Sequence, residues 1–173
     1  MIKITIPFVF AGLIAYAFAP AQAAEISGAV GVTSQGDMTY RGGLGWQWDK
    51  QWFNSSAGHL GGYWDLGYTY WEGGEEASGR HSLSFSPVFE YEFGRGRYRP
   101  FIDFGIGIAF FSGADVGDQK LGSSFNFEDR FGFGVKLGDS QRVGVRMIHY
   151  SNAGISQPND GIESYSLYYA REI

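Results

Sequence analysis

Three side chains near the end of the chain are of the types that together carry out nucleophilic acyl transfer. His149 and Ser151 stand two positions apart, and Glu163 follows after a short intervening segment. In this chemistry a carboxylate orients an imidazole, the imidazole takes a proton from a hydroxyl, and the hydroxyl oxygen attacks an ester carbonyl. We therefore take Ser151 as the candidate nucleophile, His149 as its base and Glu163 as the orienting acid.

This chemistry requires that the chain bring the three side chains to one surface. His149 and Ser151 share the parity of an alternating apolar run, and Glu163 shares the parity of the next such run. The apolar residues that define these parities are Val143, Val145 and Met147 in the first run, and Tyr165, Leu167 and Tyr169 in the second. A period of two is typical of a β-strand, whose alternate side chains lie on one face. A hairpin through residues 152–162 can therefore set His149 opposite or diagonal to Glu163, with Cβ atoms about 5 Å apart.

The same alternation runs through most of the chain and predicts an all-β protein of eight strands. Most of these strands have about ten residues or more, which suits a tilted strand that crosses a bilayer. They are expected within residues 25–33, 38–48, 60–70, 83–93, 102–110, 125–137, 143–151 and 163–173. Segments rich in Gly, Asp, Asn and Ser separate the strands, short at 94–97 and 138–140 and longer at 72–79 and 112–121.

Two architectures fit alternating strands of this kind. In a soluble sandwich or lipocalin-like barrel the apolar face points inward, whereas in a membrane barrel it faces lipid and the lumen is polar. Here the apolar face carries large aromatic residues at nearly every alternate position, which is more volume than a small barrel interior could hold. The opposite face mixes glycine with charges of both signs, and Tyr and Trp gather near strand ends. We therefore predict an eight-stranded antiparallel transmembrane β-barrel of the bacterial outer membrane.

The strand order also predicts the depth of the candidate site in the membrane. An even-stranded barrel brings both termini to the periplasmic side, where the short turns at 94–97 and 138–140 also fall. The strand that ends in His149 and Ser151 then runs outward, so both residues lie at the level of the outer leaflet. The lipid of that leaflet is lipopolysaccharide, and its acyl esters lie near this depth.

Taken alone, His149 or Ser151 would be interpreted as an ordinary residue of the membrane interface. If the strand has already ended by His149, all three side chains lie among lipid headgroups without a catalytic role. Polar side chains that face hydrocarbon are costly unless they are paired or functional, so convergence on one face favours function. The main rival is a non-catalytic small barrel, and a second rival is an acyltransferase that acts on the same lipid.

The first 23 residues are expected to be an export signal rather than part of the fold. Lys3 supplies the positive end, residues 4–18 form an apolar run, and Ala21-Gln22-Ala23 is a small-x-small cleavage site. We place the cut after Ala23, so that residues 24–173 form the barrel; a retained membrane anchor is the alternative. The chain has no cysteine and a formal net charge of -5, which exclude a thiol nucleophile and argue against a nucleic-acid partner.

Other polar residues are weaker candidates for a site. We assign His59 and His81 to the inward-facing parity, where a solvated or hydrogen-bonded histidine is the default. Two acidic pairs in the longer loops could hold a divalent cation, although neither has metal-ligand spacing: Glu75 with Glu76, and Asp115 with Asp118. Asp129 puts a carboxylate on the apolar parity, which fits either a position at the membrane interface or a supporting role at the candidate site.

Longer stretches of the chain resemble a known family. They include His149-Tyr150-Ser151-Asn152-Ala153-Gly154 and Gln157-Pro158-Asn159-Asp160-Gly161-Ile162-Glu163-Ser164-Tyr165-Ser166. They also include Tyr68-Thr69-Tyr70-Trp71-Glu72-Gly73-Gly74 and Leu121-Gly122-Ser123-Ser124-Phe125-Asn126-Phe127-Glu128-Asp129-Arg130. These stretches resemble the lipid A 3-O-deacylases of Gram-negative outer membranes, the PagL family, and a match of this length is far more specific than a three-residue motif.

The resemblance implies an eight-stranded barrel that removes the ester-linked 3-hydroxyacyl chain from position 3 of lipid A, without a metal or other cofactor. It implies Ser151 as nucleophile, His149 as base and Glu163 as orienting acid. The supporting residues it implies are Asn152 and Gly154, whose backbone would form the oxyanion hole, and Asp129 and Asn159, which would be important for activity. The substrate would be lipopolysaccharide among outer-membrane lipid, and a homodimer is left open. One departure is Ile173, because outer-membrane barrels usually end in an aromatic residue.

Overall fold

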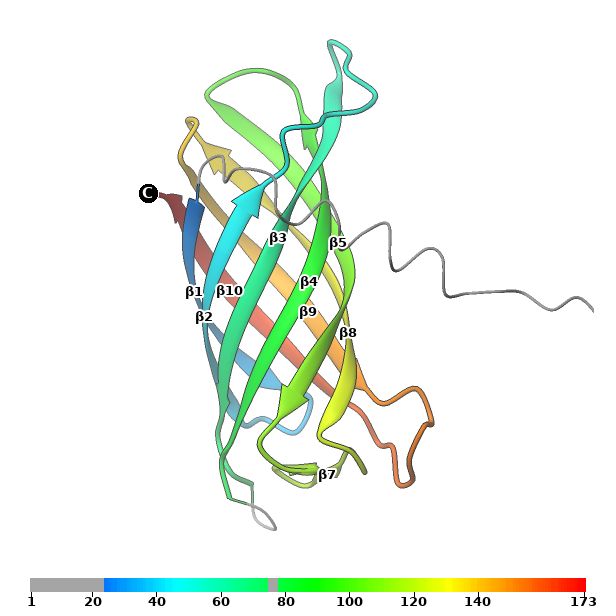
Figure 1. Ribbon diagram of the computed structural model, residues 1–173. Coiled ribbons are helices and arrows are strands. Elements are labelled where there is room, and N and C mark those ends of the chain that lie inside the picture. Colours follow the sequence, from blue (N-terminus) through cyan, green and yellow to red (C-terminus); the bar gives the residue numbers. More distant parts are fainter. Residues whose placement is uncertain (1–23, 75–77) are drawn as a thin grey trace, which may run out of the picture.

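Eight antiparallel strands close into a barrel in the computed structural model, which describes residues 24–74 and 78–173 (Figure 1). The strands are β1 (Ala24–Thr33), β2 (Met38–Gln47), β3 (Gly58–Trp71), β4 (Arg80–Phe93), β5 (Tyr98–Phe111), β8 (Phe125–Leu137), β9 (Gln141–Ser151) and β10 (Ile162–Glu172). Their order around the barrel is β1-β10-β9-β8-β5-β4-β3-β2, so that β1 closes against β10. The predicted eight-stranded all-β fold is confirmed, and each predicted range overlaps one of these strands.

The loop between β5 and β8 contains two further short strands that were predicted only as loop. These are β6 (Asp115–Val116) and β7 (Gln119–Lys120), which form a separate two-stranded sheet. Val116 of this hairpin and Leu121 next to it belong to one buried apolar cluster with Trp71 and Tyr150 of the barrel wall. The hairpin is therefore fixed to the barrel by the burial of its own apolar side chains.

The two faces of the barrel wall have opposite chemistry. Large apolar side chains project outward and remain exposed, among them Ile26, Tyr68, Phe104, Phe131, Leu167 and Tyr169. Charged side chains project inward and are buried, among them Glu25, Arg41, Asp65, Glu128, Arg130 and Arg142. This arrangement is the inverse of a soluble barrel and matches the predicted lipid-facing and lumen-facing parities.

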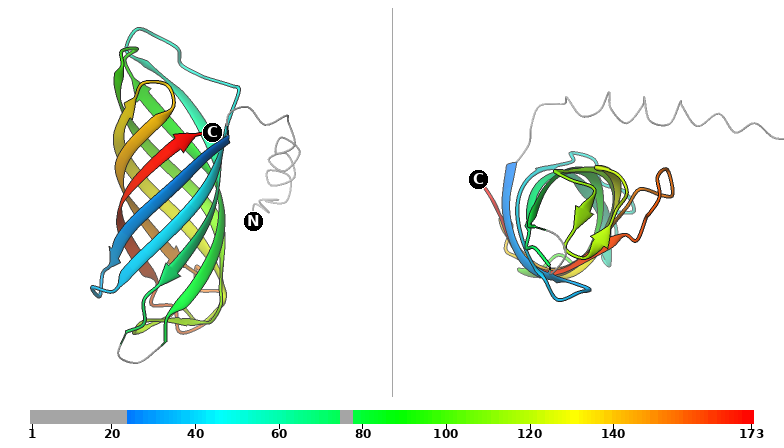
Figure 2. Two further views of the ribbon diagram at one scale, coloured as in Figure 1. Left: turned by 90° about the vertical axis from the view of Figure 1, so that its left-hand side faces the viewer. Right: turned by 90° about the horizontal axis from the view of Figure 1, so that it is seen from below.

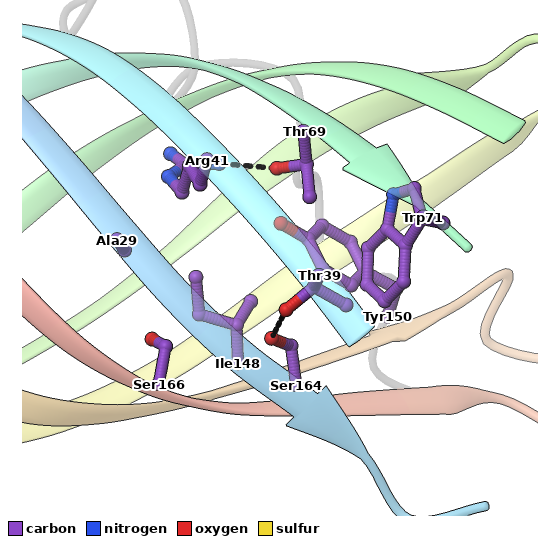
Figure 3. Close-up of a pocket in the computed structure, with 9 residues that line it drawn as sticks. All are labelled: Ala29, Thr39, Arg41, Thr69, Trp71, Ile148, Tyr150, Ser164 and Ser166. Carbon is purple, nitrogen blue, oxygen red and sulfur yellow. Dashed lines mark hydrogen bonds between the residues drawn. The ribbon is translucent and has the colours of Figure 1, made fainter. Parts of the chain in front are cut away.

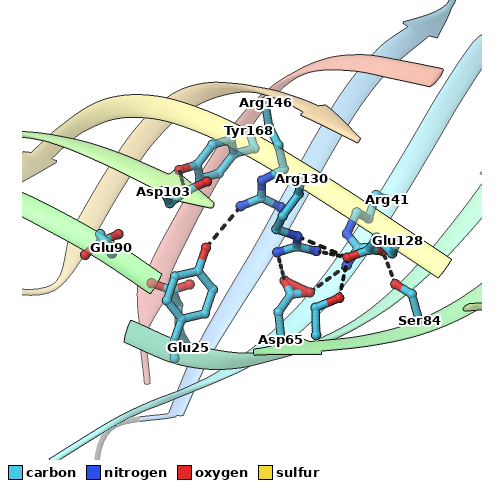
Figure 4. A network of polar contacts seen from close by, with 12 residues as sticks. Glu25, Arg41, Asp65, Ser84, Glu90, Asp103, Glu128, Arg130, Arg146 and Tyr168 are labelled. Carbon is cyan, nitrogen blue, oxygen red and sulfur yellow. Dashed lines mark hydrogen bonds and ion pairs between the residues drawn. The ribbon is translucent and has the colours of Figure 1, made fainter. Parts of the chain in front are cut away.

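Inside the barrel, buried charges of opposite sign lie against one another (Figure 4). Asp65 accepts hydrogen bonds from Arg41 at 2.6 Å and from Arg130 at 3.1 Å, and Arg130 also contacts Glu128 at 2.7 Å. A buried charge is costly unless it is paired, so these contacts offset the desolvation of each group. They also join β2, β3 and β8 across the lumen.

The connections between strands divide between the two ends of the barrel (Figures 1 and 2). One end carries the connections at 34–37, 112–124 and 152–161, together with residues 72–74 and 78–79 between β3 and β4. The other end carries 48–57, 94–97 and 138–140, together with the start of β1 and the end of β10. The two short turns therefore lie on the same side as both strand termini, as predicted.

The connection between β2 and β3 is longer than the other two at its end. Trp48 was expected to continue the second strand, but β2 ends at Gln47. Trp48 N still donates to Gly62 O at 2.8 Å, in the register of β2 and β3, and the Trp48 ring occupies the space that a side chain at Gly62 would fill. An isolated bridge between Trp52 and Leu60 then brings the segment back along β3.

Two predictions fall on parts of the chain that the structure does not describe. The proposed export signal occupies residues 1–23, and Glu75 and Glu76 lie in the gap between residues 74 and 78. Within the two described ranges, we find no helix of the length and apolar character needed to cross a membrane.

Candidate active site

Strand register brings three polar side chains into one row at the end of the barrel that carries the 152–161 loop. Asp129 of β8 pairs with His149 of β9, and His149 in turn pairs with Glu163 of β10. Asp129 is exposed, while His149 and Glu163 are half-buried. All three lie on the outward face, where most neighbouring side chains are apolar, so the row is a polar patch on the surface predicted to face lipid.

The imidazole of His149 is hydrogen-bonded to the carboxylate of Glu163. Nδ1 lies 2.7 Å from Oε1, and 33% and 29% of the two side chains are exposed. An ionised carboxylate can only accept hydrogen bonds, so Nδ1 carries a proton, and in the neutral imidazole Nε2 then presents its lone pair. An imidazole held in this tautomer can act as a general base toward a hydroxyl.

Ser151 is the last residue of β9 and lies on the same face as His149, opposite Phe127 of β8. The strand therefore continues past His149, contrary to the interpretation in which it has already ended there. Ser151 is partly exposed, at the junction between the strand and the 152–161 loop. A hydroxyl on the same face as an oriented imidazole meets one requirement of nucleophilic attack, which also needs the two groups within hydrogen-bond reach of each other.

The carboxylate of Glu163 has a second partner that sequence reasoning missed. Ser34 Oγ donates to Glu163 Oε2 at 3.0 Å from the turn between β1 and β2. The two residues are 129 positions apart. Because a serine in a Ser-Gln-Gly-Asp segment indicates only a turn, no local signal in the sequence identifies this contact.

Asn152 organises the loop that follows the candidate nucleophile. Its side chain is fully buried, and Nδ2 donates to Leu121 O at 2.7 Å and to Ser156 O at 2.9 Å. Its backbone N–H donates to Asn159 Oδ1 at 3.0 Å, so this amide has a partner already. Together Asn152 and Asn159 tie the start of the loop to its end.

The 152–161 loop also rests on β7 and on the segment that follows it. Asp160 N donates to Lys120 O and Lys120 N donates to Asp160 Oδ2, both at 3.1 Å. Gly122 approaches the loop so closely that a Cβ atom there would lie 2.0 Å from the Pro158 carbonyl oxygen. These contacts hold the two loops together as one unit beside the candidate site.

Gly161 places the end of this loop directly against the imidazole. Its φ is +72°, and a Cβ atom would lie 2.8 Å from His149 Cε1 and 3.5 Å from Nε2. Glycine is therefore required both by the backbone conformation and by the space. At the other end of the loop, Ala153 and Gly154 also have positive φ, 53° and 78°, and both are exposed.

Behind the candidate site, hydrogen bonds between inward-facing residues stabilise the barrel wall. The hydroxyl of Ser164, one residue after the carboxylate, lies 2.7 Å from Thr39 Oγ1 beside a small cavity of about 10 Å³ (Figure 3). Tyr150, which lies between the candidate base and nucleophile, donates to Glu128 Oε2 at 2.7 Å. Because these alternate residues point into the packed interior, the candidate catalytic side chains lie on the outer face alone.

The two remaining histidines lie on different faces. His59 has the inward parity of β3, as predicted. The prediction for His81 was wrong: it is exposed on the outer face, and its Nδ1 lies 2.6 Å from the Tyr68 hydroxyl. Odd-numbered residues of β4 point outward, so His81 has the same parity as Leu83.

The acidic residues of the β6–β7 hairpin belong to a different sheet from the triad candidates. Asp115 pairs with Lys120 across the hairpin, and Asp118 lies in its turn. Across residues 24–74 and 78–173, no group of three or more His, Asp and Glu side chains is placed so that it could hold a metal ion.

Comparison with known proteins links this site to one family. The family model described as Lipid A 3-O-deacylase (PagL) matches residues 34–172, a range that includes every candidate site residue. The lipid A deacylase PagL of Pseudomonas aeruginosa is 64% identical over 161 residues, which cover 93% of each chain. The lipid A deacylase PagL of Bordetella bronchiseptica is 35% identical over 162 residues, which cover 90% of this chain and 89% of the relative.

One solved structure extends this likeness to three dimensions. It is described as the crystal structure of the outer membrane enzyme PagL, and it shares 64% sequence identity with this chain. The superposition has a TM-score of 0.85 and covers 86% of this chain and 99% of the other.

Proposed function

The chain belongs to the lipid A 3-O-deacylase (PagL) family, and we propose that it hydrolyses the ester of the 3-hydroxyacyl chain at position 3 of lipid A. It is an ester hydrolase of the outer membrane, as its 64% identity to the outer membrane enzyme supports. With the strand termini on the periplasmic side, the candidate site lies at the level of the outer leaflet. Lipopolysaccharide presents its acyl esters there.

The observation that carries this proposal is the hydrogen bond between His149 and Glu163 on the outward face, with Ser151 on the same face. Polar side chains that face hydrocarbon are costly unless they are paired or functional. A substrate that is itself a membrane lipid can reach an outward-facing site by lateral diffusion. The proposed chemistry therefore needs no passage through the filled lumen.

In the proposed first step, Ser151 Oγ attacks the ester carbonyl carbon while His149 Nε2 takes the hydroxyl proton. Glu163 stabilises the imidazolium that forms. The tetrahedral intermediate collapses when the bond between the carbonyl carbon and the 3-oxygen of the sugar breaks, and His149 gives its proton to that oxygen. The acyl chain is then esterified to Ser151, and the deacylated lipid leaves.

In the second step, His149 takes a proton from a water molecule whose oxygen attacks the acyl carbon. The bond to Ser151 Oγ breaks, and the proton returns to that oxygen. The products are a 3-hydroxy fatty acid and a lipid A molecule with a free 3-hydroxyl. These steps balance without an electron carrier or a second substrate other than water.

We propose that the backbone amides of Asn152 and Gly154 stabilise the negative charge that develops on the carbonyl oxygen. Their position directly after Ser151 supports this role, as does the exposed backbone at Gly154. The Asn152 amide donates to Asn159 Oδ1, so it would exchange that partner for the oxyanion when substrate binds. Asp129, which pairs with His149 across β8 and β9, would add negative charge near the imidazolium.

Two further proposals concern the whole chain. All the proposed catalytic residues come from one chain, so a homodimer would not be needed to complete the site.

Residues 1–23 would be an export signal cleaved after Ala23, because a protein of the outer membrane has to be exported. Intact mass measurement of the protein extracted from outer membranes would test this, and a retained signal would contradict the cleavage.

Mass spectrometry of lipid A from cells that express the wild type or Ser151→Ala tests the proposed reaction. The wild type should remove one 3-hydroxyacyl chain, whereas Ser151→Ala should remove none although its barrel is intact. Ser140→Ala is a matched control, because Ser140 lies in the turn between β8 and β9 at the opposite end of the barrel. This control should act as the wild type does.

The other outcomes would distinguish the rivals. Activity in Ser151→Ala would contradict the assignment of the nucleophile. Unchanged lipid A with a folded wild-type barrel in the outer membrane would favour a non-catalytic protein. A gain of acyl chain, with loss from phospholipid, would indicate an acyltransferase.

A further inference from the structure

We propose that Ser34 is a positioning residue for the triad acid: it holds the carboxylate of Glu163 so that Oε1 faces His149. This inference rests on the proposed function, because it assigns Ser34 a part in the same hydrolysis. Ser34 would touch neither substrate nor nucleophile. It would act through Glu163 on the imidazole.

The two oxygens of the Glu163 carboxylate have one partner each. Oε1 lies 2.7 Å from His149 Nδ1, and Oε2 accepts from Ser34 Oγ at 3.0 Å. Because an ionised carboxylate is acceptor-only, the serine hydroxyl donates and its proton points at Oε2. Two donors on opposite oxygens fix the rotation of the carboxylate plane, which a single bond to the imidazole would leave free.

The turn that carries Ser34 is itself held by several hydrogen bonds. Thr33 Oγ1 accepts from Gln35 N at 3.2 Å and from Asp37 N at 3.1 Å, and Thr33 N donates to Asp37 O at 2.8 Å. Gly36, with φ of +99°, closes the turn by donating to Thr33 O at 3.1 Å. Ser34 therefore projects from a defined turn, so its contact with Glu163 is directed by the backbone.

The position of this turn is set by the seam where the first and last strands meet. Thr33 pairs with Ser164 as the last rung between β1 and β10, so Ser34 follows β1 at the level of Glu163. On the inner side, Ser164 Oγ lies 2.7 Å from Thr39 Oγ1 of β2 (Figure 3). The hydrogen bond between Ser164 and Thr39 on the inner face and the one between Ser34 and Glu163 on the outer face therefore stabilise the same end of the β1–β10 pairing.

If Oε2 of Glu163 had no hydrogen-bond partner, the carboxylate would be less well oriented toward His149, which would weaken catalysis. Glu163 is a long side chain on the outward face, and 29% of it is exposed. Long side chains lose rotamer freedom when they are ordered, and catalytic groups have to be held within a fraction of an ångström. The Ser34 bond supplies this restraint from outside the triad, in the way that outer-shell partners orient metal-bound histidines.

Steady-state kinetics on purified, folded protein with lipid A test the role of Ser34. Ser34→Ala should lower kcat about tenfold and leave KM nearly unchanged, because orientation of the base affects chemistry more than binding. Ser34→Thr keeps the hydroxyl and should restore most of kcat. Gln35→Ala, a change at the exposed neighbour in the same turn, is the matched control and should keep the wild-type kcat.

A double-mutant cycle separates positioning through Glu163 from a general structural effect. In the Glu163→Ala background, adding Ser34→Ala should change kcat by less than about twofold, because the group through which Ser34 acts is gone. A further tenfold loss in that background would overturn the proposal, as would a wild-type kcat in Ser34→Ala. Heat-dependent gel mobility would show that each variant is folded.

Imidazole ¹⁵N NMR provides a readout that does not depend on turnover. The Nδ1–H signal of His149 should be sharp in the wild type and broadened or shifted in Ser34→Ala, and restored in Ser34→Thr. An unchanged signal in Ser34→Ala would overturn the inference. If the signal changed in Ser34→Ala and was restored in Ser34→Thr, but the wild type did not hydrolyse lipid A, the proposed function would fail while the positioning of Glu163 by Ser34 would stand.

Discussion

At the residue scale, the chemistry of this surface depends on how His149 is held. Glu163 determines which imidazole nitrogen carries the proton, and the other nitrogen is left to accept one. Gly161 packs its backbone against the ring, so the imidazole is restrained from a second side. His149 and Glu163 therefore contribute unequally to the rate of hydrolysis, since His149 transfers the proton and Glu163 only orients His149.

The two variants His149→Ala and Glu163→Ala should differ in the size of their effect. Loss of the base should lower kcat by about a millionfold, whereas loss of the orienting acid should lower it by about ten-thousandfold. Single-turnover and steady-state rates of lipid A hydrolysis would measure both. Glu163→Gln is a useful companion, because it keeps the shape of the side chain but removes its charge. A larger loss in Glu163→Ala than in His149→Ala would contradict the assigned roles.

Parity along a strand made the pairing of His149 with Glu163 predictable, because both residues belong to neighbouring strands joined by one hairpin. The contact of Ser34 with Glu163 was not predictable in this way. It forms across the seam between the first and last strands, and the register of that seam is not encoded by any local turn. The outward position of His81 could have been predicted from parity alone and was missed.

At the scale of elements, the 152–161 loop and the segment around β7 form one unit beside the candidate site. Asn152 is central to it, because a single buried amide joins the end of β9 to Leu121 and Ser156. Sequence reasoning identified Asn152 only through its backbone. The side-chain contacts depend on how the two loops pack, which turn composition does not specify.

Asn152→Ala should loosen this unit more than it destabilises the barrel. The change leaves the buried carbonyl oxygen of Leu121 and the part-buried one of Ser156 without this donor, which costs about 1–3 kcal/mol. Hydrogen exchange should therefore quicken at residues 152–161 while the amides of the barrel strands keep their protection, and hydrolysis should fall. Asn54→Ala, at an exposed position in the connection at the opposite end, should change neither. Unaltered exchange in the loop of Asn152→Ala would show that the amide does not hold it.

At the scale of the whole molecule, the barrel exposes aromatic and aliphatic side chains and buries its charges. The contrast is sharp between adjacent residues: Met147 is 39% exposed on the outer face, while Arg146 is buried with its guanidinium 4.1 Å from the Tyr168 ring centre. Alternation this regular is why the architecture could be predicted from the sequence. The packing of the Trp48 ring over Gly62, at the start of the connection between β2 and β3, could not, because no periodic pattern specifies it.

Met147→Arg tests whether the outer face meets hydrocarbon. Met147 lies between Phe131 of β8 and Tyr165 of β10, so its side chain is surrounded by apolar neighbours on the outward surface. A membrane-facing arginine costs roughly 2–4 kcal/mol near the bilayer midplane, so the folded fraction in lipid vesicles should fall markedly. Met147→Leu, which keeps the apolar character, should insert as the wild type does. The folded fraction can be followed by heat-dependent gel mobility across a denaturant series.

Because a detergent micelle adapts to a charge more readily than a bilayer, the loss of folded Met147→Arg should be larger in vesicles than in detergent. Equal insertion of Met147→Arg and Met147→Leu would mean that this face does not meet lipid, and a lipid substrate would then need another route to His149.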